Sequence, residues 1–415
     1  MKFIADFHLH SKYSRATSPQ MDLENLDNWA KTKGIKILGT GDFTHPEWFK
    51  TLREKLEPAD PGLYKLKGVS SETRFILTVE ISNVYSKKGK IRKIHIIIFA
   101  PSFEIAEKIN THLGWIGNLR ADGRPILGLD SKELAKIVLN ISEDCLIVPA
   151  HCMTPWFGIF GSKSGFDSIE ECFEDYSKYI FALETGLSAD PKMIWRIPDG
   201  RKVTLISNSD SHSPSHIGRE ANVFDTEISY PAIIKAIKEK DPQKFLYTIE
   251  FFPQEGKYHY DGHRICGISL SPKESKKYNN ICPNCGRPLT IGVFNRVDSL
   301  ADRPEGFKPE DAIPFKSLVP LTEIIADALG VTVGTKQVEA EYRNLIEKFG
   351  NEFKVLLDAP RQDLESITLP EIAEGIIRVR EGRVNIEPGY DGVYGKIRIF
   401  SKGEQKSLSG QGTLF

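Results

Sequence analysis

The sequence lacks the features that mark membrane proteins, secreted disulfide scaffolds and basic nucleic-acid coats. No apolar run approaches the ~18 residues of a membrane span, and no basic stretch followed by an apolar segment opens the chain. Six cysteines in 415 residues are too few for a secreted disulfide scaffold. With a net charge of -1, a nucleic-acid partner would need a local positive surface. We therefore expect a cytoplasmic, globular protein without a membrane partner.

The first 250 residues alternate strand-like and helix-like patterns. Apolar runs such as "KFIAD", "RFILTVE" and "CLIVPA" are typical of buried strands, and "SKELAKIVLN" has the period of an amphipathic helix. The helical stretch "LENLDNWAKTKG" is expected to end at Gly34, a natural C-cap residue. Repeated strand–helix units predict an α/β domain over 1–250, built as a parallel barrel or a doubly wound sheet.

The rest of the chain has a different pattern. Residues 251–295 are rich in aromatics, glycine and histidine and are expected to form a small module. Residues 296–400 are expected to be mainly helical, with a short hairpin around "NIEPGYDGVYGKIRIF". Residues 401–415 have the composition of a flexible tail.

Histidines and acids follow the apolar strands of the first domain at five places. Because the carboxyl ends of parallel strands converge on one mouth, residues distant in sequence can form one cluster there. One buried histidine beside a strand is more often a core residue, so the argument rests on the repetition. Imidazole and carboxylate together suit Zn, Mn or Fe, whereas a site with few histidines would suit Mg. The strand-end residues are His8, His10, Asp42, His45, Glu80, His151, Asp210 and His212, and His95 lies inside a strand with its side chain expected in the barrel interior.

These motifs resemble the PHP (polymerase and histidinol phosphatase) family. The similar segments are "DFHLHS", "GTGDFTH", "TVEIS", "KIHIIIFA", "PAHCMTP" and "SNSDSHSP", and they span residues 1 to about 250. The resemblance implies a distorted seven-stranded β/α barrel that binds two or three catalytic metals, which would be Zn, Mn or Mg. It also implies a metal-dependent hydrolase.

The resemblance implies roles for individual residues. His8 and His10, with Glu80 and Asp210, would bind one metal, and a bridging Glu80 with His95 and His151 would bind a second. His212 would bind a third metal with Asp42 or His45, and Asp6 would orient a ligand. Asp210 or His212 could also transfer protons. Two departures concern the third metal: the acid usual after the first histidine pair is missing from "SKYSRATS", and the usual "TDH" is replaced by "GDFTH".

Three clustered cysteines predict a separate, structural zinc site. "HRICG" and "CPNCG" each have the ligand-x-x-ligand-glycine form of a metal knuckle. The expected ligands are His263, Cys266, Cys282 and Cys285, with His259 as a rival for the histidine and Asp261 as a weaker one. A closed site of this kind stabilises a module too small to bury much apolar area.

A further resemblance extends over the whole chain. "GTGDFTHPEWF", "EGKYHYDGHR" and "ICPNCGRPLTIGV" are similar to segments of the archaeal-type endonuclease Q family. That resemblance implies a DNA repair endonuclease that cuts the phosphodiester 5′ to deaminated bases (uracil, hypoxanthine, xanthine) and to abasic sites. Because a stacked base cannot be inspected, we expect base flipping.

Candidate DNA contacts follow from the position and type of the residues. Each has a structural alternative: the aromatics as core residues, the lysines as a solvated turn and the arginines as surface ion pairs. The candidates are Ser82, Asn83, Tyr85, Lys87, Lys88, Trp115, Trp156, Phe157, Arg296 and Arg303.

The end of the chain resembles a sliding-clamp binding peptide. Gln411 and Leu414 match its first two anchors, and the sequence stops before an aromatic pair, so this chain is expected to bind a clamp poorly. Two rival functions remain open. A PHP phosphatase of small molecules, such as a histidinol-phosphatase-like enzyme, would leave the zinc module without a role. A DNA-binding module with a structural metal site would leave the strand-end ligands without one.

Overall fold

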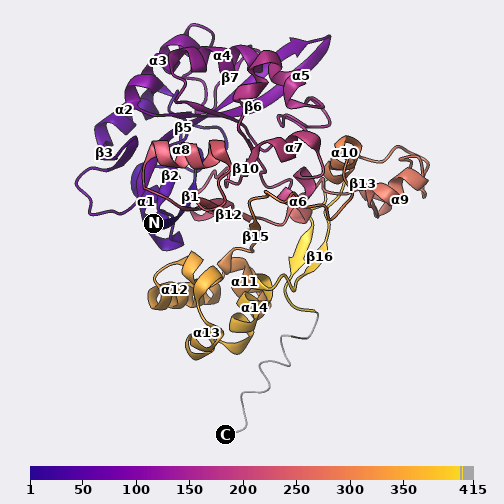
Figure 1. The fold of residues 1–415 in the computed structure, drawn as a ribbon. Coiled ribbons are helices and arrows are strands. Elements are labelled where there is room, and N and C mark those ends of the chain that lie inside the picture. The colour runs from indigo at the N-terminus through magenta and orange to yellow at the C-terminus, as the bar shows by residue number, and fades with distance from the viewer. Residues whose placement is uncertain (402–403, 405–415) are drawn as a thin grey trace.

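A mixed sheet forms the body of the molecule (Figure 1). The structure is a computed structural model that describes residues 1–401 and 404. Among the helices of this described part, none has the length and apolar content that crossing a bilayer requires. Gln411 and Leu414, the predicted clamp anchors, lie outside the described residues.

Seven strands carry the site. Parallel pairs join β1 to β2 and β2 to β5, antiparallel pairs join β5 to β6 and β6 to β8, and β9 pairs with β10 in parallel. Their bounds are β1 (Lys2–Asp6), β2 (Ile37–Gly39), β5 (Arg74–Lys87), β6 (Lys90–Ala100), β8 (Leu146–Pro149), β9 (Ala182–Glu184) and β10 (Thr204–Ile206).

Two backbone contacts beyond the strand ends connect these pairs into a ring. The Cys152 amide donates to the Glu184 carbonyl oxygen between β8 and β9, and the His10 amide donates to the Ser211 carbonyl oxygen between β10 and β1, each at 2.9 Å. The mixed α/β class is therefore confirmed. The closed barrel stays a prediction, because these two joints lack the extended ladders of the others.

Further strands extend the sheet on either side of this ring. β11 pairs antiparallel with β1 and with β12, and β12 pairs with β15 in parallel, whereas β3, β4 and β7 lie on the β5 side. Their bounds are β3 (Leu56–Asp60), β4 (Leu63–Leu66), β7 (Ile126–Leu127), β11 (Ala221–Asp225), β12 (Phe245–Glu250) and β15 (Phe315–Ser317).

Short helices surround the sheet, and local signals explain where they start and stop. In α1 the Asp22 carboxylate accepts from the Asn25 amide at the N-cap, and Gly34 adopts φ +89° at the C-cap, as its position in the sequence predicts. The helices of this region are α1 (Leu23–Lys33), α2 (Pro46–Lys55), α3 (Phe103–Gly114), α4 (Ser131–Ile141), α5 (Ile169–Phe173), α6 (Pro191–Ile194), α7 (Pro198–Lys202) and α8 (Tyr230–Glu239).

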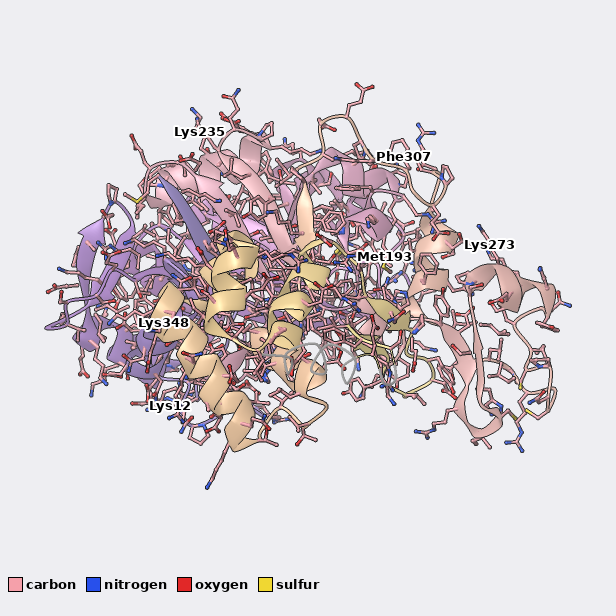
Figure 2. All side chains as sticks on the ribbon, turned by 90° about the horizontal axis from the view of Figure 1, so that it is seen from below. Lys12, Met193, Lys235, Lys273, Phe307 and Lys348 are labelled. Carbon is pink, nitrogen blue, oxygen red and sulfur yellow. The ribbon has the colours of Figure 1, made fainter. Side chains whose placement is uncertain are left out.

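A small lobe follows the sheet and projects from one side of the body, with Lys273 on its helix (Figure 2). It contains a two-stranded antiparallel pair, a short helix and a second helix that leads back to the body. These elements are β13 (Asp261–His263), β14 (Ile268–Leu270), α9 (Pro272–Lys277) and α10 (Val293–Leu300). We call residues 259–292 the cysteine lobe.

Four helices and a hairpin form the last described part. α11 and α14 pack together through buried apolar side chains that include Ile324, Ile325 and Ile376. The bounds are α11 (Leu321–Leu329), α12 (Lys336–Phe349), α13 (Arg361–Ile367), α14 (Pro370–Arg380), β16 (Asn385–Glu387) and β17 (Lys396–Arg398). The order of sheet, small lobe, helices and hairpin agrees with the predicted fold class, whereas the predicted domain boundaries stay predictions.

Candidate metal centre

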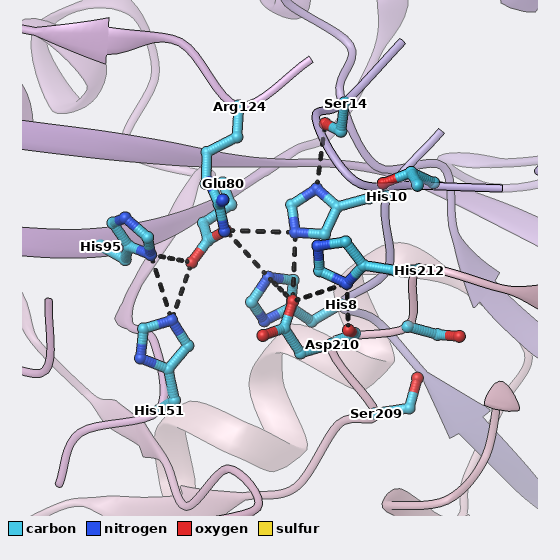
Figure 3. A network of polar contacts seen from close by, with 12 residues as sticks. His8, His10, Ser14, Glu80, His95, Arg124, His151, Ser209, Asp210 and His212 are labelled. Carbon is cyan, nitrogen blue, oxygen red and sulfur yellow. Dashed lines mark hydrogen bonds and ion pairs between the residues drawn. The ribbon is translucent and has the colours of Figure 1, made fainter. Parts of the chain in front are cut away.

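Six side chains from distant parts of the chain converge, four from segments that follow strands and two, Glu80 and His95, from inside β5 and β6 (Figure 3). They form two groups of possible metal-ligand atoms, each within 4.8 Å, that share one carboxylate. The first group is His8, His10, Glu80 and Asp210, and the second is Glu80, His95 and His151. These are the sets that the PHP resemblance implies for two metals.

Unusual backbone geometry helps to aim these side chains. His151 and Asp210 have φ angles of +30° and +46°, values that residues other than glycine rarely adopt. His151 comes two residues after the end of β8 and Asp210 four residues after the end of β10, so both left-handed conformations lie in the loops that leave the sheet. Such strain persists where the surrounding structure holds it, which is typical of functional sites.

Glu80 lies between the two groups. Its Oε1 is 2.7 Å from His95 Nδ1 and 3.0 Å from His151 Nε2, and its Oε2 is 3.2 Å from His10 Nε2. Burial alone would raise the pKa of Glu80, but nearby His95, His8 and Arg124 hold it well below its usual value. Glu80 therefore stays ionised with one oxygen facing each group, which is the geometry of a bridging ligand.

The histidines of the first group each turn Nε2 toward the other ligand atoms of the group, and His10 Nε2 lies 3.1 Å from Asp210 Oδ1. His8 Nδ1 lies 3.0 Å from Glu184 Oε1, and His10 Nδ1 lies 3.1 Å from Asp42 Oδ1. Each carboxylate accepts the Nδ1 proton, so the Nε2 lone pair points into the cluster. This carboxylate–histidine arrangement fixes both the tautomer and the ring orientation.

The donor set fits a divalent metal. His8 Nε2 is buried and has no hydrogen-bond partner among the described residues, although it faces Glu80 Oε2 at 3.4 Å. Burial alone would lower the pKa of His8, but Glu184, Glu80 and Asp210 raise it well above its usual value. The pocket therefore favours positive charge among its carboxylates, and mixed nitrogen and oxygen donors suit Zn, Mn or Fe.

Two residues of the centre are not apparent from the sequence reasoning. Glu184 is fully buried; it accepts from the His151 amide at 2.8 Å and from Asn208 Nδ2 at 2.9 Å, in addition to its contact with His8. Glu184 is the last residue of the strand "ALE", so the strand-end signal could have found it, whereas Glu80, predicted at a strand end, lies inside β5. Arg124 donates from Nη1 to Glu80 Oε2 at 3.1 Å and comes from a loop with no distinguishing pattern.

Asp42, His45 and His212, which the PHP resemblance implies for a third metal, lie outside the two ligand groups of the described residues, and the third metal stays a prediction. Asp42 already accepts at Oδ2 from the Ser11 amide and from the Ser11 and Ser14 hydroxyls, so it orients His10 instead. His45 occupies the N-cap position of α2 without a side-chain capping bond, its ring stacks on Tyr13 at a centroid distance of 4.4 Å, and its Nδ1 is buried with no hydrogen-bond partner among the described residues. Ser11 and Ser14 belong to the segment "SKYSRATS", which lacks the acid that the PHP pattern has there. Their hydroxyls instead donate hydrogen bonds to Asp42.

His212 and Asp6 flank the centre without joining either ligand group. His212 Nδ1 donates to the Asp210 carbonyl oxygen at 2.8 Å, which leaves Nε2 as an acceptor, and its ring lies 4.6 Å from that of His10. Asp6 accepts from the Ser209 amide and hydroxyl and from the Gly218 amide, and its burial raises its pKa to about 6. The support that Asp6 provides therefore reaches the neighbour of Asp210 and not a histidine.

A second candidate metal site lies in the cysteine lobe. His263, Cys266, Cys282 and Cys285 place one ligand atom each within 4.8 Å of one another. The rival His259 is buried between other groups, with its ring stacked on Phe294 at 5.7 Å, and Asp261 accepts from the Gly292 amide and from Asn295. The knuckle geometry therefore selects His263.

Several candidate DNA contacts have side chains committed to protein partners. Asn83 is fully buried and donates to the Leu129 carbonyl oxygen, and the Tyr85 hydroxyl donates to Ser131. Arg296 donates to the carbonyl oxygens of Phe160 and Phe166 and pairs with an aspartate, so it ties α10 to the body. These placements correct the expectation that the three side chains face DNA.

The remaining candidates divide between the metal centre, ion pairs and solvent. The Ser82 hydroxyl bonds to His95 Nε2, Phe157 packs against the His95 ring at 4.2 Å, and Lys87 pairs with Asp130 and Glu174. Four side chains stay accessible: Trp115 and Trp156, which are 76% and 49% exposed, together with Lys88 and Arg303.

Two adjoining cavities open at the centre. One of about 400 Å³ is lined by His95, His151 and Asp210 together with Trp156 and Phe157. The other, of about 1000 Å³ and mainly apolar, shares both aromatic residues and continues toward Phe251 and Tyr258. The metal centre is therefore accessible from a larger apolar space.

A histidine–carboxylate centre with a shared acid at the ends of sheet strands defines a PHP-type protein. Comparison with solved structures narrows this class. PfuEndoQ from Pyrococcus furiosus, described as a lesion-specific endonuclease, is 32% identical with a TM-score of 0.86, over 99% of both chains. An endonuclease Q in complex with a 27-mer duplex substrate that has an abasic lesion at the active site gives 32% identity and a TM-score of 0.84, over 98% of this chain and 100% of that chain. The chain belongs to the endonuclease Q family.

Two further relatives have no described activity. The uncharacterized protein MJ0043 of Methanocaldococcus jannaschii is 37% identical over 310 residues, which cover 70% of this chain but only 37% of that protein. The uncharacterized protein YqxK of Bacillus subtilis is 26% identical over 96% of this chain and 99% of its own length. The MJ0043 C-terminal domain family matches residues 320–383, the segment that contains α11 to α14.

Proposed function

We propose that this protein is a metal-dependent DNA repair endonuclease that cuts the phosphodiester 5′ to deaminated bases and abasic sites. The observation that carries the proposal is the cluster around a bridging Glu80 in a chain similar over nearly its whole length to endonuclease Q. The similar structure with an abasic duplex at its active site supports DNA as the substrate.

In this proposal the chain's own residues hold and orient the reaction centre. His8, His10, Glu80 and Asp210 would bind one metal, and Glu80, His95 and His151 a second; metals bound there would acidify water and stabilise charge on the phosphate. Glu184 and Asp42 keep two of the imidazoles in the ligating tautomer. The identity and number of the metals belong to the proposal and to its test.

Two groups at the mouth are suited to the substrate phosphate and the leaving group. Arg124 is half-buried, faces the smaller cavity and can offset negative charge on a phosphate oxygen. His212 Nε2 is left as an acceptor by the Nδ1 bond, and burial lowers the pKa of this imidazole, so Nε2 could take a proton from the attacking water and pass it to the departing 3′ oxygen. The side chains of both residues are partly exposed, as contact with a substrate requires.

The adjoining cavities support a base-flipping step. A nucleotide turned out of the duplex could place its phosphate at the smaller cavity and its base in the larger, mainly apolar one. Trp156 lies where the two cavities meet and is exposed enough to stack on a base or to fill its vacated place.

End-labelled duplexes carrying uracil, hypoxanthine, an abasic site or normal bases test the proposal in the presence of Mg²⁺ or Mn²⁺. We expect a single nick on the 5′ side of each lesion and none in the normal duplex. Cleavage of p-nitrophenyl phosphate without cleavage of DNA would overturn the proposal in favour of a small-molecule phosphatase. Tight DNA binding without cutting would favour a binding module.

A further inference from the structure

A polar cavity of about 500 Å³ lies at the end of the β5–β6 hairpin, outside the metal centre. Its lining includes four cationic side chains that the proposed reaction does not use: Lys88, Lys90, Arg92 and Lys163. Lys88 lies in the hairpin turn, Lys90 and Arg92 lie on β6, and Lys163 comes from the loop after Phe157.

These charges are not neutralised by neighbouring acids. Within the described residues, Lys88, Lys90 and Lys163 take part in no salt bridge closer than 4.0 Å, whereas the adjacent Lys87 pairs with two acids at 3.3 and 3.0 Å. Only two acids are among the cavity's lining residues, against five cations: Asp167 pairs at 2.6 Å with Arg296, which also lines the cavity, and Glu171 accepts from the Asp167 amide at 3.1 Å. The cavity therefore keeps an excess of positive charge.

The contacts of Arg92 fix the position of its guanidinium group at the cavity. Its guanidinium lies 4.0 Å from the centroid of the Phe166 ring and donates from Nη1 to the Gly165 carbonyl oxygen. Its Nε is buried without a hydrogen-bond partner among the described residues. A stacked guanidinium with an unmet donor, next to three lysine ammonium groups, is suited to a phosphate group.

The strand spacing gives the separation of these residues from the centre along β6. The backbone positions of Arg92 and Lys90 precede that of His95 by three and five residues, roughly 10 and 17 Å at about 3.3 Å per residue, and their side chains leave β6 on the face opposite to His95. One strand of a duplex advances about 3.4 Å per nucleotide, so this span corresponds to roughly three to five nucleotides.

We infer that this cavity binds a backbone phosphate of the duplex about three to five nucleotides from the cleaved bond. The inference rests on the proposed function, because it places the flank of the same DNA substrate. The site recognises phosphate and not base identity, so it contributes to affinity and register without lesion preference.

The test combines removal of the lysine charges at the cavity with shortening of the duplex on one side of the lesion. Lys88→Gln, Lys90→Gln and Lys163→Gln are combined in one variant, and the matched control combines Lys50→Gln, Lys65→Gln and Lys235→Gln, solvent-accessible lysines on α2, β4 and α8 that do not line the cavity. Lesion duplexes carry either 12 base pairs on both sides or only 2 on one side, each side in turn. Affinity is measured in the Asp210→Asn background, and nicking rates are measured in the active enzyme.

We expect shortening of one particular flank to weaken wild-type binding by roughly 10-fold and to have little effect on the cavity variant, which already binds the long duplex weakly. The slope of log Kd against log salt should become shallower by about 0.9 for each phosphate that the variant no longer neutralises. The rate of nicking at saturating DNA should not change. The control variant should keep the flank dependence of the wild type.

The inference is overturned if the cavity variant keeps the full flank dependence or if the control variant loses as much affinity. It is also overturned if inorganic phosphate binds at the cavity while flank length has no effect on DNA affinity, because the site would then bind a free anion. Failure of the proposed function gives a different result: no lesion duplex is nicked, while the salt slope on undamaged duplex still reports the cavity.

Discussion

The two candidate metal sites of this molecule are built in opposite ways. The centre at the strand ends takes its ligands from positions 8 to 210, buries most of them and shares one carboxylate between two groups. The cysteine lobe takes all four ligands from 263 to 285, and its Cys285 is exposed. A site assembled by the core can remain organised without metal, whereas a small lobe with little buried apolar area depends on its metal to fold.

The largest expected effect concerns the strand-end centre. Asp210→Asn should lower lesion nicking by about 10³-fold or more, because the amide cannot replace an anionic ligand, and the fold and DNA binding should be retained. Nicking is measured under single-turnover conditions, binding by fluorescence anisotropy and the fold by circular dichroism. Asp144→Asn, a change of an exposed acid, is the control. A normal nicking rate in Asp210→Asn would contradict the assignment of this centre as the catalytic one of the two candidate metal sites.

The next largest effect concerns the lobe. His263→Asn should lose about one equivalent of bound zinc and make residues 264–290 sensitive to protease, while the sheet keeps its thermal transition. His259→Asn is the matched change of a nearby histidine and should keep its zinc. Metal content is measured after dialysis and cleavage sites by mass spectrometry. Equal zinc loss in both variants would contradict the ligand assignment.

A smaller effect should follow from changing a support of the strand-end centre. Glu184→Gln keeps the shape of the side chain but removes the charge that holds the His8 tautomer, so Mn²⁺ affinity should fall by about 10- to 100-fold. Mn²⁺ binding is followed by electron paramagnetic resonance, which does not require turnover. Glu133→Gln, a change of an acid in the first turn of α4, should leave the affinity unchanged, and an unchanged affinity in Glu184→Gln would rule out the support role.

The smallest expected effect is a pH dependence of stability that arises from Glu250, a buried carboxyl next to this centre. Burial raises the pKa of Glu250 to about 8, and its Oε2 accepts from the Thr185 hydroxyl, one residue from Glu184. A carboxyl with a raised folded-state pKa stabilises the fold fully below its unfolded pKa, and this stability is lost as the pH rises toward 8. Glu250→Gln should therefore gain stability relative to wild type between pH 5 and 8, on the order of 1–3 kcal/mol. Urea midpoints across that range provide the measurement, and a pH-independent difference would contradict the raised pKa.

Local patterns account for what could be anticipated. His8 and His10 stand two residues apart, so the strand geometry alone puts both on one face. Each of the two knuckles of the lobe places its pair of candidate ligands three positions apart. The caps of α1 are the residues Asp22 and Gly34. In all these cases the interacting groups are close in sequence, and backbone geometry leaves few alternatives.

Other features depended on contacts that no local pattern encodes. Asp42 lies outside both ligand groups of the described residues, and its second oxygen accepts from Ser11 and Ser14, a contact made across about thirty residues of chain. The expectation for Arg296 failed because α10 packs against the loop that contains Phe160 and Phe166. No sequence pattern marks Arg124 as part of the centre, since its role arises only from its hydrogen bond to Glu80 in the folded structure.

The sequence by itself determined the alternation of strands and helices, the chemical type of the candidate ligands and the residues of the candidate cysteine–histidine site, because each of these follows from neighbours along the chain. Only the tertiary structure decided that Glu184 and Asp42 lie against Nδ1 of His8 and His10, that Arg124 reaches Glu80, and that the cations beside the hairpin surround a cavity. The physical reason is that hydrogen bonds and charge interactions act over a few ångströms, and residues as much as 200 positions apart reach such distances only when the sheet is complete.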